Sequence, residues 1–114
     1  MYDLVTDLRA RLRDAYPNDN LRRCVGYGHL GDSNLHLNLT STKYDDRLFE
    51  LIEPYVFEWT RKHRGSVSAE HGLGLKKRDY IGYSKSEALV GEMRKIKLMF
   101  DPRLIMNPYK TIPL

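Results

Sequence analysis

Two histidines flank a glycine-containing segment in the first third of the chain. The segment reads GHLGDSNLHLNLT and contains His29 and His36. If Asp32 and Ser33 form a two-residue turn between antiparallel strands, His29 lies directly opposite His36. Opposed side chains share one face of a sheet with Cβ atoms about 5 Å apart, which is close enough for two imidazoles to hold one metal ion. The spacing therefore indicates a candidate metal site.

A catalytic metal of the zinc type normally takes three protein ligands and keeps one position open, so a third donor is needed. Glu70, in the segment SVSAEHGLG, is the best candidate, and its neighbour His71 is also available. Adjacent residues on a regular strand face opposite ways, so both can serve one site only if the chain leaves strand geometry there. Gly72 and Gly74 make that departure easy.

The spacing also allows an ordinary surface interpretation. The register that pairs the histidines places Tyr27 opposite Asn38 on the same face. Two cross-strand histidines can equally form a hydrogen-bonded surface pair, and spacing alone favours neither the metal site nor this alternative. Because the sequence holds neither an HExxH helix nor a cysteine-rich ligand set, hydrolytic zinc enzymes and zinc fingers have no support.

Hydrophobic spacing predicts the elements that position these residues. Leu4, Leu8 and Leu12 recur at helical spacing, and Pro17 with Asn18 should stop that first helix. From residue 21 to residue 40, alternating apolar and polar residues predict two strands joined by a tight turn.

The rest of the chain reads mainly as helix. A helix is predicted over residues 45–63, with a kink or restart at Pro54, followed by a short strand over residues 65–69. A final helix over residues 86–100 should begin at the cap Ser86 and carry an apolar face made of Leu89, Met93, Ile96 and Phe100. Helices mixed with a few strands indicate an α+β fold.

Length and composition limit the possible classes. With 114 residues and 41% hydrophobic content, the chain is predicted to form one domain, residues 1–114. Its single cysteine, Cys24, can close no internal disulfide and is interpreted as buried and structural.

The net charge of +4 suits an acidic ligand, a nucleic acid or an anionic membrane. The basic run at Lys76, Lys77 and Arg78 is interpreted first as a solvated helix face and second as an anion contact. No stretch is long and apolar enough to predict a membrane span.

Three segments together resemble the C-terminal region of the FAD-linked oxidases related to vanillyl-alcohol oxidase. They are GHLGDSNLHLNLT, GSVSAEHGLGLKKRDYIGYSK and FDPRLIMNPYKTIP. The histidine hairpin and the EHG segment are shared across that superfamily, whereas SVSAEHGLG, KRDYIGYSK and NPYKTIP are closest to its D-2-hydroxyglutarate dehydrogenase branch. The resemblance implies a partial ferredoxin-like cap domain, in which helices pack on one face of an antiparallel sheet.

The resemblance also implies roles for individual residues. His29, His36 and Glu70 would bind a divalent metal, usually zinc, while Asn38 and His71 would contact the substrate. His71 would act as general base while hydride passes from the substrate C2 to FAD. The alternative roles are an orienting hydrogen bond for His71 and a backbone hydrogen bond for Asn38.

Three further positions depart from the family or belong to its closing motif. Ser33 occupies a turn position where relatives commonly have glycine. Asn107 and Lys110 resemble a closing motif that packs toward the flavin domain, and a capped turn with a solvated lysine is an equally favoured interpretation.

By the same resemblance, FAD is bound mainly by a flavin domain upstream of this chain, so the chain alone should be inactive. The implied partners are a 2-hydroxy dicarboxylate substrate, that flavin domain and an electron-transfer flavoprotein as acceptor, and a homodimer is compatible with the family. The compartment would be mitochondrial in a eukaryote and cytoplasmic otherwise. Two alternatives remain open: a D-lactate or glycolate dehydrogenase with the same metal triad, and a non-enzymatic basic module that binds nucleic acid. The second has little support, because no aromatic residues are interleaved with a basic stripe.

Overall fold

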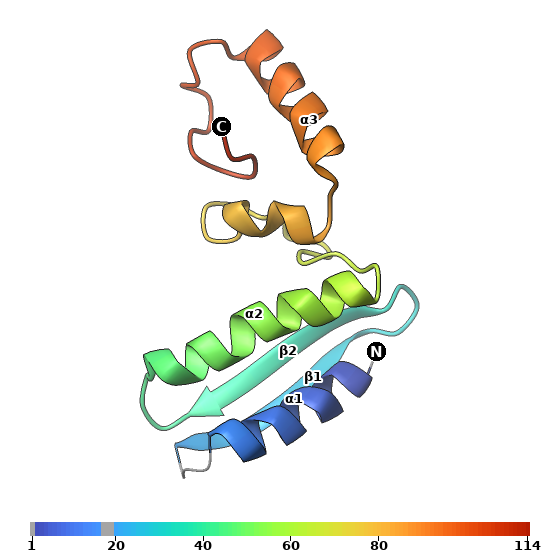
Figure 1. The fold of residues 1–114 in the computed structure, drawn as a ribbon, viewed down its shortest axis with the longest axis vertical. Helices are drawn as coiled ribbons and strands as arrows, with labels where there is room; N and C mark the ends of the chain where they lie inside the picture. The colour runs from blue at the N-terminus through green and yellow to red at the C-terminus, as the bar shows by residue number, and fades with distance from the viewer. Residues whose placement is uncertain (1, 17–19) are drawn as a thin grey trace. The chain divides into compact units, whose positions relative to one another are not determined.

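Four helical segments and a two-stranded antiparallel sheet make up the described part of the chain, residues 2–16 and 20–114 of this computed structural model. In chain order these are α1 (Asp3–Ala15), β1 (Leu21–His29), β2 (Asn34–Ser41), α2 (Asp46–Lys62), the 3-10 helix η1 (Arg78–Tyr83) and α3 (Glu87–Phe100) (Figure 1). The predicted α+β class is confirmed. The contacts gather in two compact units, Met1–Trp59 and Thr60–Leu114.

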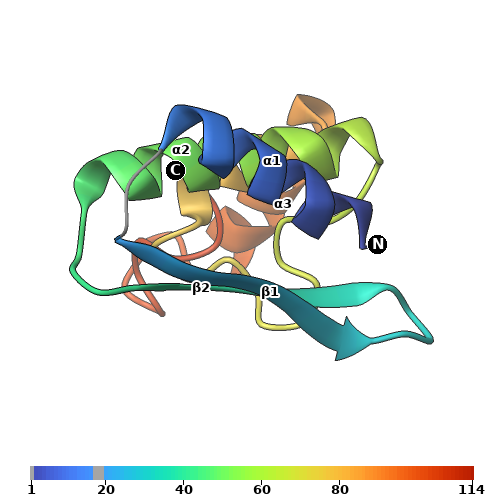
Figure 2. The ribbon, with the colours of Figure 1, turned by 90° about the horizontal axis from the view of Figure 1, so that it is seen from below.

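The first unit is built in two layers. Helices α1 and α2 lie on the same side of the β1–β2 hairpin (Figure 2). The core between the layers is formed by six buried side chains: Val5, Leu8, Leu12, Tyr16, Cys24 and Leu48. Leu35, Leu37 and Leu39 of β2 pack against this cluster. One face of the hairpin is therefore covered by helices, and the other face points away from the core.

Helix α1 follows the leucine spacing of the sequence. Leu8 and Leu12 are completely buried because residues at helical spacing share one side of the helix. The helix approaches the sheet at Gly26, where a Cβ atom would lie 2.5 Å from Cγ2 of Val5. Glycine at this position lets α1 pack directly on β1. The predicted stop at Pro17 and Asn18 lies outside the described residues.

Helix α2 runs from Asp46 to Lys62 without interruption, although Pro54 lies inside it. The predicted restart at Pro54 is therefore wrong. Packing of the apolar side of α2 on the hairpin compensates for the backbone hydrogen bond that proline cannot donate. Asp45 helps to start the helix, since its Oδ1 accepts a hydrogen bond from the backbone N–H of Arg47 at 2.9 Å. Tyr16 donates a hydrogen bond to the Asp45 carboxylate, which lowers the pKa of that carboxyl.

The second unit contains no strand among its described residues, so the strand predicted over residues 65–69 is wrong. The segment forms bends instead, and side-chain oxygens and carbonyls take its hydrogen bonds. The backbone N–H of Val67 donates to Oγ of Ser84 at 2.8 Å, and the Ser68 hydroxyl donates to the carbonyl of Gly72 at 2.6 Å. A turn and then η1 follow, and η1 was not predicted.

Helix α3 begins where the sequence predicts. The Ser86 side chain accepts a hydrogen bond from the backbone N–H of Leu89, as an N-cap residue does. The predicted apolar face is mostly exposed: Leu89, Ile96 and Phe100 keep 47%, 55% and 74% of their surface, while Val90 is buried. The spacing thus indicated a helix correctly but does not say which side is covered. Among the described residues, no helix combines the length and apolar character needed to cross a bilayer.

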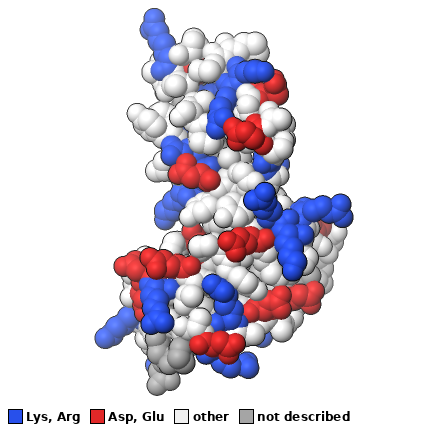
Figure 3. Space-filling model, viewed as in Figure 1, with Lys and Arg blue, Asp and Glu red and all other residues white. Residues whose placement is uncertain are grey.

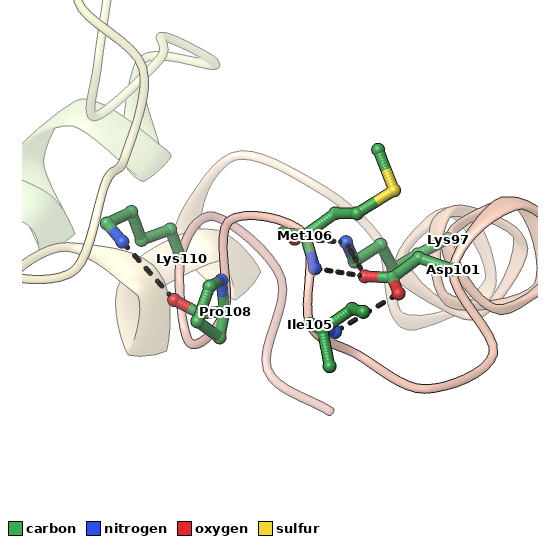
Figure 4. Close-up of polar contacts among 6 residues, drawn as sticks. All are labelled: Lys97, Asp101, Ile105, Met106, Pro108 and Lys110. Atoms are coloured by element: carbon green, nitrogen blue, oxygen red, sulfur yellow. Dashed lines mark hydrogen bonds and ion pairs between the residues drawn. The ribbon is translucent and has the colours of Figure 1, made fainter.

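The C-terminal segment is tied to α3 through one buried carboxylate (Figure 4). Asp101 accepts hydrogen bonds from Nζ of Lys97 at 2.6 Å and from the backbone N–H groups of Ile105 and Met106 at 3.1 and 2.9 Å. The Lys97 ammonium, together with these backbone donors, lowers the pKa of Asp101. Lys97 also donates to the Met106 carbonyl at 2.6 Å. The carboxylate therefore fixes the first turn after α3.

The predicted basic run has mixed roles. Lys77 donates to the Val67 carbonyl at 3.4 Å, and Arg78 forms an ion pair with Asp79 at 2.9 Å. Lys76 is exposed. Acidic and basic side chains alternate on the face drawn in Figure 3. A continuous basic stripe of the kind that tracks a nucleic-acid backbone is not visible on that face.

Candidate functional site

The outward face of the hairpin brings His29 and His36 together. Their ring centroids lie 5.9 Å apart with an interplanar angle of 62°. The predicted direct opposition is wrong, because the register pairs His29 with Asn34 and His36 with Tyr27. The two histidines are diagonal neighbours on one face. They remain close enough for both imidazoles to reach a common ion.

The length of the connecting loop causes this difference in register. Residues 30–33 form a turn between the strands, instead of Asp32 and Ser33 alone. The Asp32 side chain accepts a hydrogen bond from the backbone N–H of Asn34 at 3.2 Å, which is an Asx turn. Ser33 has a φ of 59°, a left-handed conformation that glycine adopts more readily. Because the register moves by two residues, the histidines keep the face on which the sequence placed them.

Each histidine has a cross-strand neighbour other than the one that the sequence predicted. The Asn34 side-chain nitrogen lies 3.5 Å from Nδ1 of His29, and Asn34 is buried. The Tyr27 ring stacks on the His36 ring with centroids 5.5 Å apart and planes 7° apart. A four-residue loop, signalled by Asp32 two residues before Asn34, would have predicted both pairs.

Asn38 also lies on the histidine face. It is exposed and pairs with Val25, not with Tyr27 as the two-residue turn would require. Side chains on the same face of a strand alternate, so Asn38 stands two residues beyond His36 on the same side. This placement agrees with a side chain that can contact a ligand held by the histidines.

Glu70 and His71 lie in the second unit on irregular backbone. Oε1 of Glu70 is 3.3 Å from Nε2 of His71, and 37% and 78% of the two side chains are exposed. Two adjacent side chains can meet in this way because the chain is not extended there. Gly72 and Gly74, with φ of 74° and 57°, supply the left-handed conformations that follow. The chain therefore leaves strand geometry here, which the sequence set as the condition for both side chains to serve one site.

Cys24 is not one of the candidate site residues. It lies in the core beneath β1, where burial raises the pKa of its thiol. A thiol that is harder to deprotonate is a poorer metal ligand and nucleophile. Its interpretation as a buried structural residue is confirmed.

Comparison with known proteins identifies the family. A family model described as "FAD linked oxidases, C-terminal domain" matches residues 1–111. The chain belongs to this family. The match includes both hairpin histidines, Asn38 and the Glu70–His71 pair. All of these candidate site residues therefore lie within the family's C-terminal domain.

Similar curated proteins include three mitochondrial D-2-hydroxyglutarate dehydrogenases. The chain is 56% identical to the one from Arabidopsis thaliana, 55% to the one from Bos taurus and 57% to the one from Danio rerio, over 99% of its own length in each case. A putative mitochondrial D-lactate dehydrogenase from Schizosaccharomyces pombe is 47% identical over 98% of the chain. The chain spans about a fifth of the length of these relatives, 19–22%.

The closing residues fit a structural role in the second unit. Lys110 donates a hydrogen bond from Nζ to the carbonyl of Pro108 at 3.4 Å (Figure 4), and Asn107 has a φ of 48°. The backbone N–H of Thr111 donates to the carbonyl of Gly74 at 2.8 Å. These contacts hold the tail against the segment that follows Glu70 and His71.

Proposed function

We propose that this chain is the metal- and substrate-binding part of a flavin-dependent dehydrogenase that oxidises D-2-hydroxyglutarate to 2-oxoglutarate. The pairing of His29 and His36 on the outward face of the hairpin, in a chain of the FAD-linked oxidase family, is the observation that carries the proposal. The substrate is taken from the relatives named D-2-hydroxyglutarate dehydrogenase, which are the more similar ones.

His29, His36 and Glu70 would hold the metal. Two imidazoles and one carboxylate form a donor set that suits zinc or another divalent ion and leaves a coordination position open. The imidazole rings already share one face, and the Glu70 side chain is accessible. When bound, the metal supplies Lewis acidity that lowers the pKa of a coordinated alcohol.

Asn38 and His71 would contact the substrate directly. The Asn38 amide, on the histidine face, can donate a hydrogen bond to a substrate carboxylate. His71 is mostly exposed, and its Nε2 lies 3.3 Å from Oε1 of Glu70. A histidine so placed can accept the proton of the substrate hydroxyl and act as general base.

The remaining parts of the reaction would come from outside this chain. Family membership supports FAD as the cofactor, which supplies the hydride acceptor when bound by a flavin domain. In that assembly the first unit would be part of a ferredoxin-like cap. An electron-transfer flavoprotein would reoxidise the flavin, and the names of the relatives support a mitochondrial location.

The metal proposal is tested by cobalt binding. Co²⁺ gives visible absorption bands when bound by nitrogen and oxygen ligands and can be titrated into the full chain. His29→Ala, His36→Ala and Glu70→Ala should each weaken binding at least tenfold, about the effect of losing a ligand or its support. His63→Ala changes an exposed histidine that is not one of the three proposed ligands and should leave binding unchanged. Equal affinity for all five proteins would contradict the proposal.

The substrate is tested by turnover. The full-length dehydrogenase should oxidise D-2-hydroxyglutarate with a higher kcat/KM than D-lactate or glycolate, because only the dicarboxylate offers a second anionic group. The reverse order would favour the D-lactate dehydrogenase alternative that the fission yeast relative represents. The 114-residue chain by itself, prepared without flavin, should not oxidise any of the three acids.

A further inference from the structure

In the observed register each histidine of the hairpin has its own cross-strand neighbour. His29 pairs with Asn34, and His36 pairs with Tyr27. Directly opposed side chains are the closest neighbours on a sheet face, so each imidazole contacts a specific cross-strand residue as well as the other imidazole. One partner is a buried amide and the other an exposed aromatic ring.

We propose that Asn34 and Tyr27 are positioning residues, which hold the imidazoles of His29 and His36 in the orientation that binds the metal. This inference rests on the proposed metal site and adds two residues that act through its ligands. The physical reason is that a histidine ligand needs its ring orientation and its tautomer fixed by a group behind it.

Asn34 acts on His29 by hydrogen bonding. The Asn34 side chain is only 7% exposed and lies 3.5 Å from Nδ1 of the ring. Since Nδ1 faces Asn34, we assign Nε2 as the metal-binding atom. Nδ1 then carries the proton, and the Asn34 amide accepts it through Oδ1, which needs only a half-turn of the amide about its own axis. The Asx turn at Asp32 fixes the Asn34 backbone and so the position of the amide.

Tyr27 acts on His36 by stacking. The rings are nearly parallel, with planes 7° apart and centroids 5.5 Å apart, so rotation of the imidazole would break the contact. Tyr27 is 60% exposed and lies outside the core cluster. Its removal should therefore change the orientation of His36 more than it changes the stability of the hairpin.

The stacking contact is tested by Co²⁺ titration of the full chain with two substitutions at one position. Tyr27→Ala should weaken Co²⁺ binding about tenfold, the lower end for groups that orient a metal ligand, whereas Tyr27→Phe keeps a ring and should bind as the unchanged chain does. Tyr44→Ala is the matched control, because Tyr44 is an exposed tyrosine, 79% accessible, that stacks on neither histidine. The urea midpoint of each protein shows whether the fold is intact.

The hydrogen bond is tested by restoring an acceptor. Asn34→Leu should weaken Co²⁺ binding by tenfold or more, and Asn34→Asp, which offers a carboxylate oxygen to Nδ1, should recover most of the loss. Nitrogen-15 NMR of the zinc-loaded chain should show the proton of His29 on Nδ1. Loss of that signal in Asn34→Leu would identify the hydrogen bond as its cause.

The outcomes separate the two proposals. If His29→Ala abolishes binding while Tyr27→Ala and Asn34→Leu bind Co²⁺ as tightly as the unchanged chain, the positioning roles are wrong and the metal site stands. If the unchanged chain binds no Co²⁺, both proposals fail. A loss of affinity that only follows a lowered urea midpoint, with no rescue by Tyr27→Phe or Asn34→Asp, would assign these residues a purely structural role.

Discussion

The sharpest structural prediction concerns Gly28, which lies between Tyr27 and His29 on β1. A Cβ atom at this position would lie 1.9 Å from the backbone oxygen of Asn34 and 3.0 Å from its carbonyl carbon. Both atoms belong to the backbone of β2, so they cannot move aside as a flexible side chain would. Gly28→Ala must therefore part the strands at the end that carries both histidines.

The expected loss of stability follows from two terms. The φ of 155° at Gly28 is one that residues with a side chain rarely adopt, which costs about 1–3 kcal/mol. Forcing a methyl group into a filled space costs a further 1–3 kcal/mol or so. Reduced freedom of the unfolded chain returns about 0.4–1 kcal/mol. We expect Gly28→Ala to lower the free energy of unfolding of the first unit by about 1–5.5 kcal/mol.

The fluorescence of the single tryptophan measures this loss. Nε1 of Trp59 donates a hydrogen bond to Asp7 of α1 at 2.9 Å, so its emission reports whether the first unit is folded during urea titration. Gly31→Ala is the control, because no atom lies within 4 Å of a Cβ at that position, and its effect should stay within about 0.5 kcal/mol. If Gly28→Ala is as stable as Gly31→Ala and binds Co²⁺ equally well, the register of the hairpin is wrong.

Three further predictions follow from single residues. Leu8→Ala, in the fully buried core, should lower the free energy of unfolding by about 2–5 kcal/mol, measured by tryptophan fluorescence. Ser33→Gly should raise it by up to about 1 kcal/mol, since a left-handed φ costs serine more than glycine; a loss in the same assay would refute this. The pKa of Asp101 is lowered in the folded protein, so its carboxylate stabilises the fold fully above the ordinary pKa of 3.8. This stabilisation is lost as the pH falls through the lower pKa of the folded state. Amide-exchange protection at Ile105 and Met106 should fall over that acidic range, and Asp101→Asn should reduce it at neutral pH and remove its dependence on acidic pH.

Sequence predicted the elements whose signal is local. The leucine spacing of α1 and the cap at Ser86 give both helices with their approximate ends, because helical periodicity and capping involve only nearby residues. The face shared by His29, His36 and Asn38 was also predictable, since a register error of two residues leaves every side chain on its face.

The predictions that were wrong concern features that depend on distant contacts or on loop conformation. The segment over residues 65–69 has strand-like composition but gains no partner strand, and its serines bond locally instead. Pro54 is tolerated because α2 is supported by the hairpin, which no local rule describes. The pairs His29–Asn34 and His36–Tyr27 depend on the conformation of the loop that contains Ser33. Ser33 has a left-handed backbone conformation, which is not predicted from a serine in the sequence.

The hairpin separates two tasks by face. Leu35, Leu37 and Leu39 pack against the helices, while His36 and Asn38 alternate with them on the opposite side. Donor atoms on the outer side can therefore be exchanged one at a time without repacking any leucine. For the proposed metal site, this means that preference for an ion or an acid could change through outward residues while the leucine layer is kept.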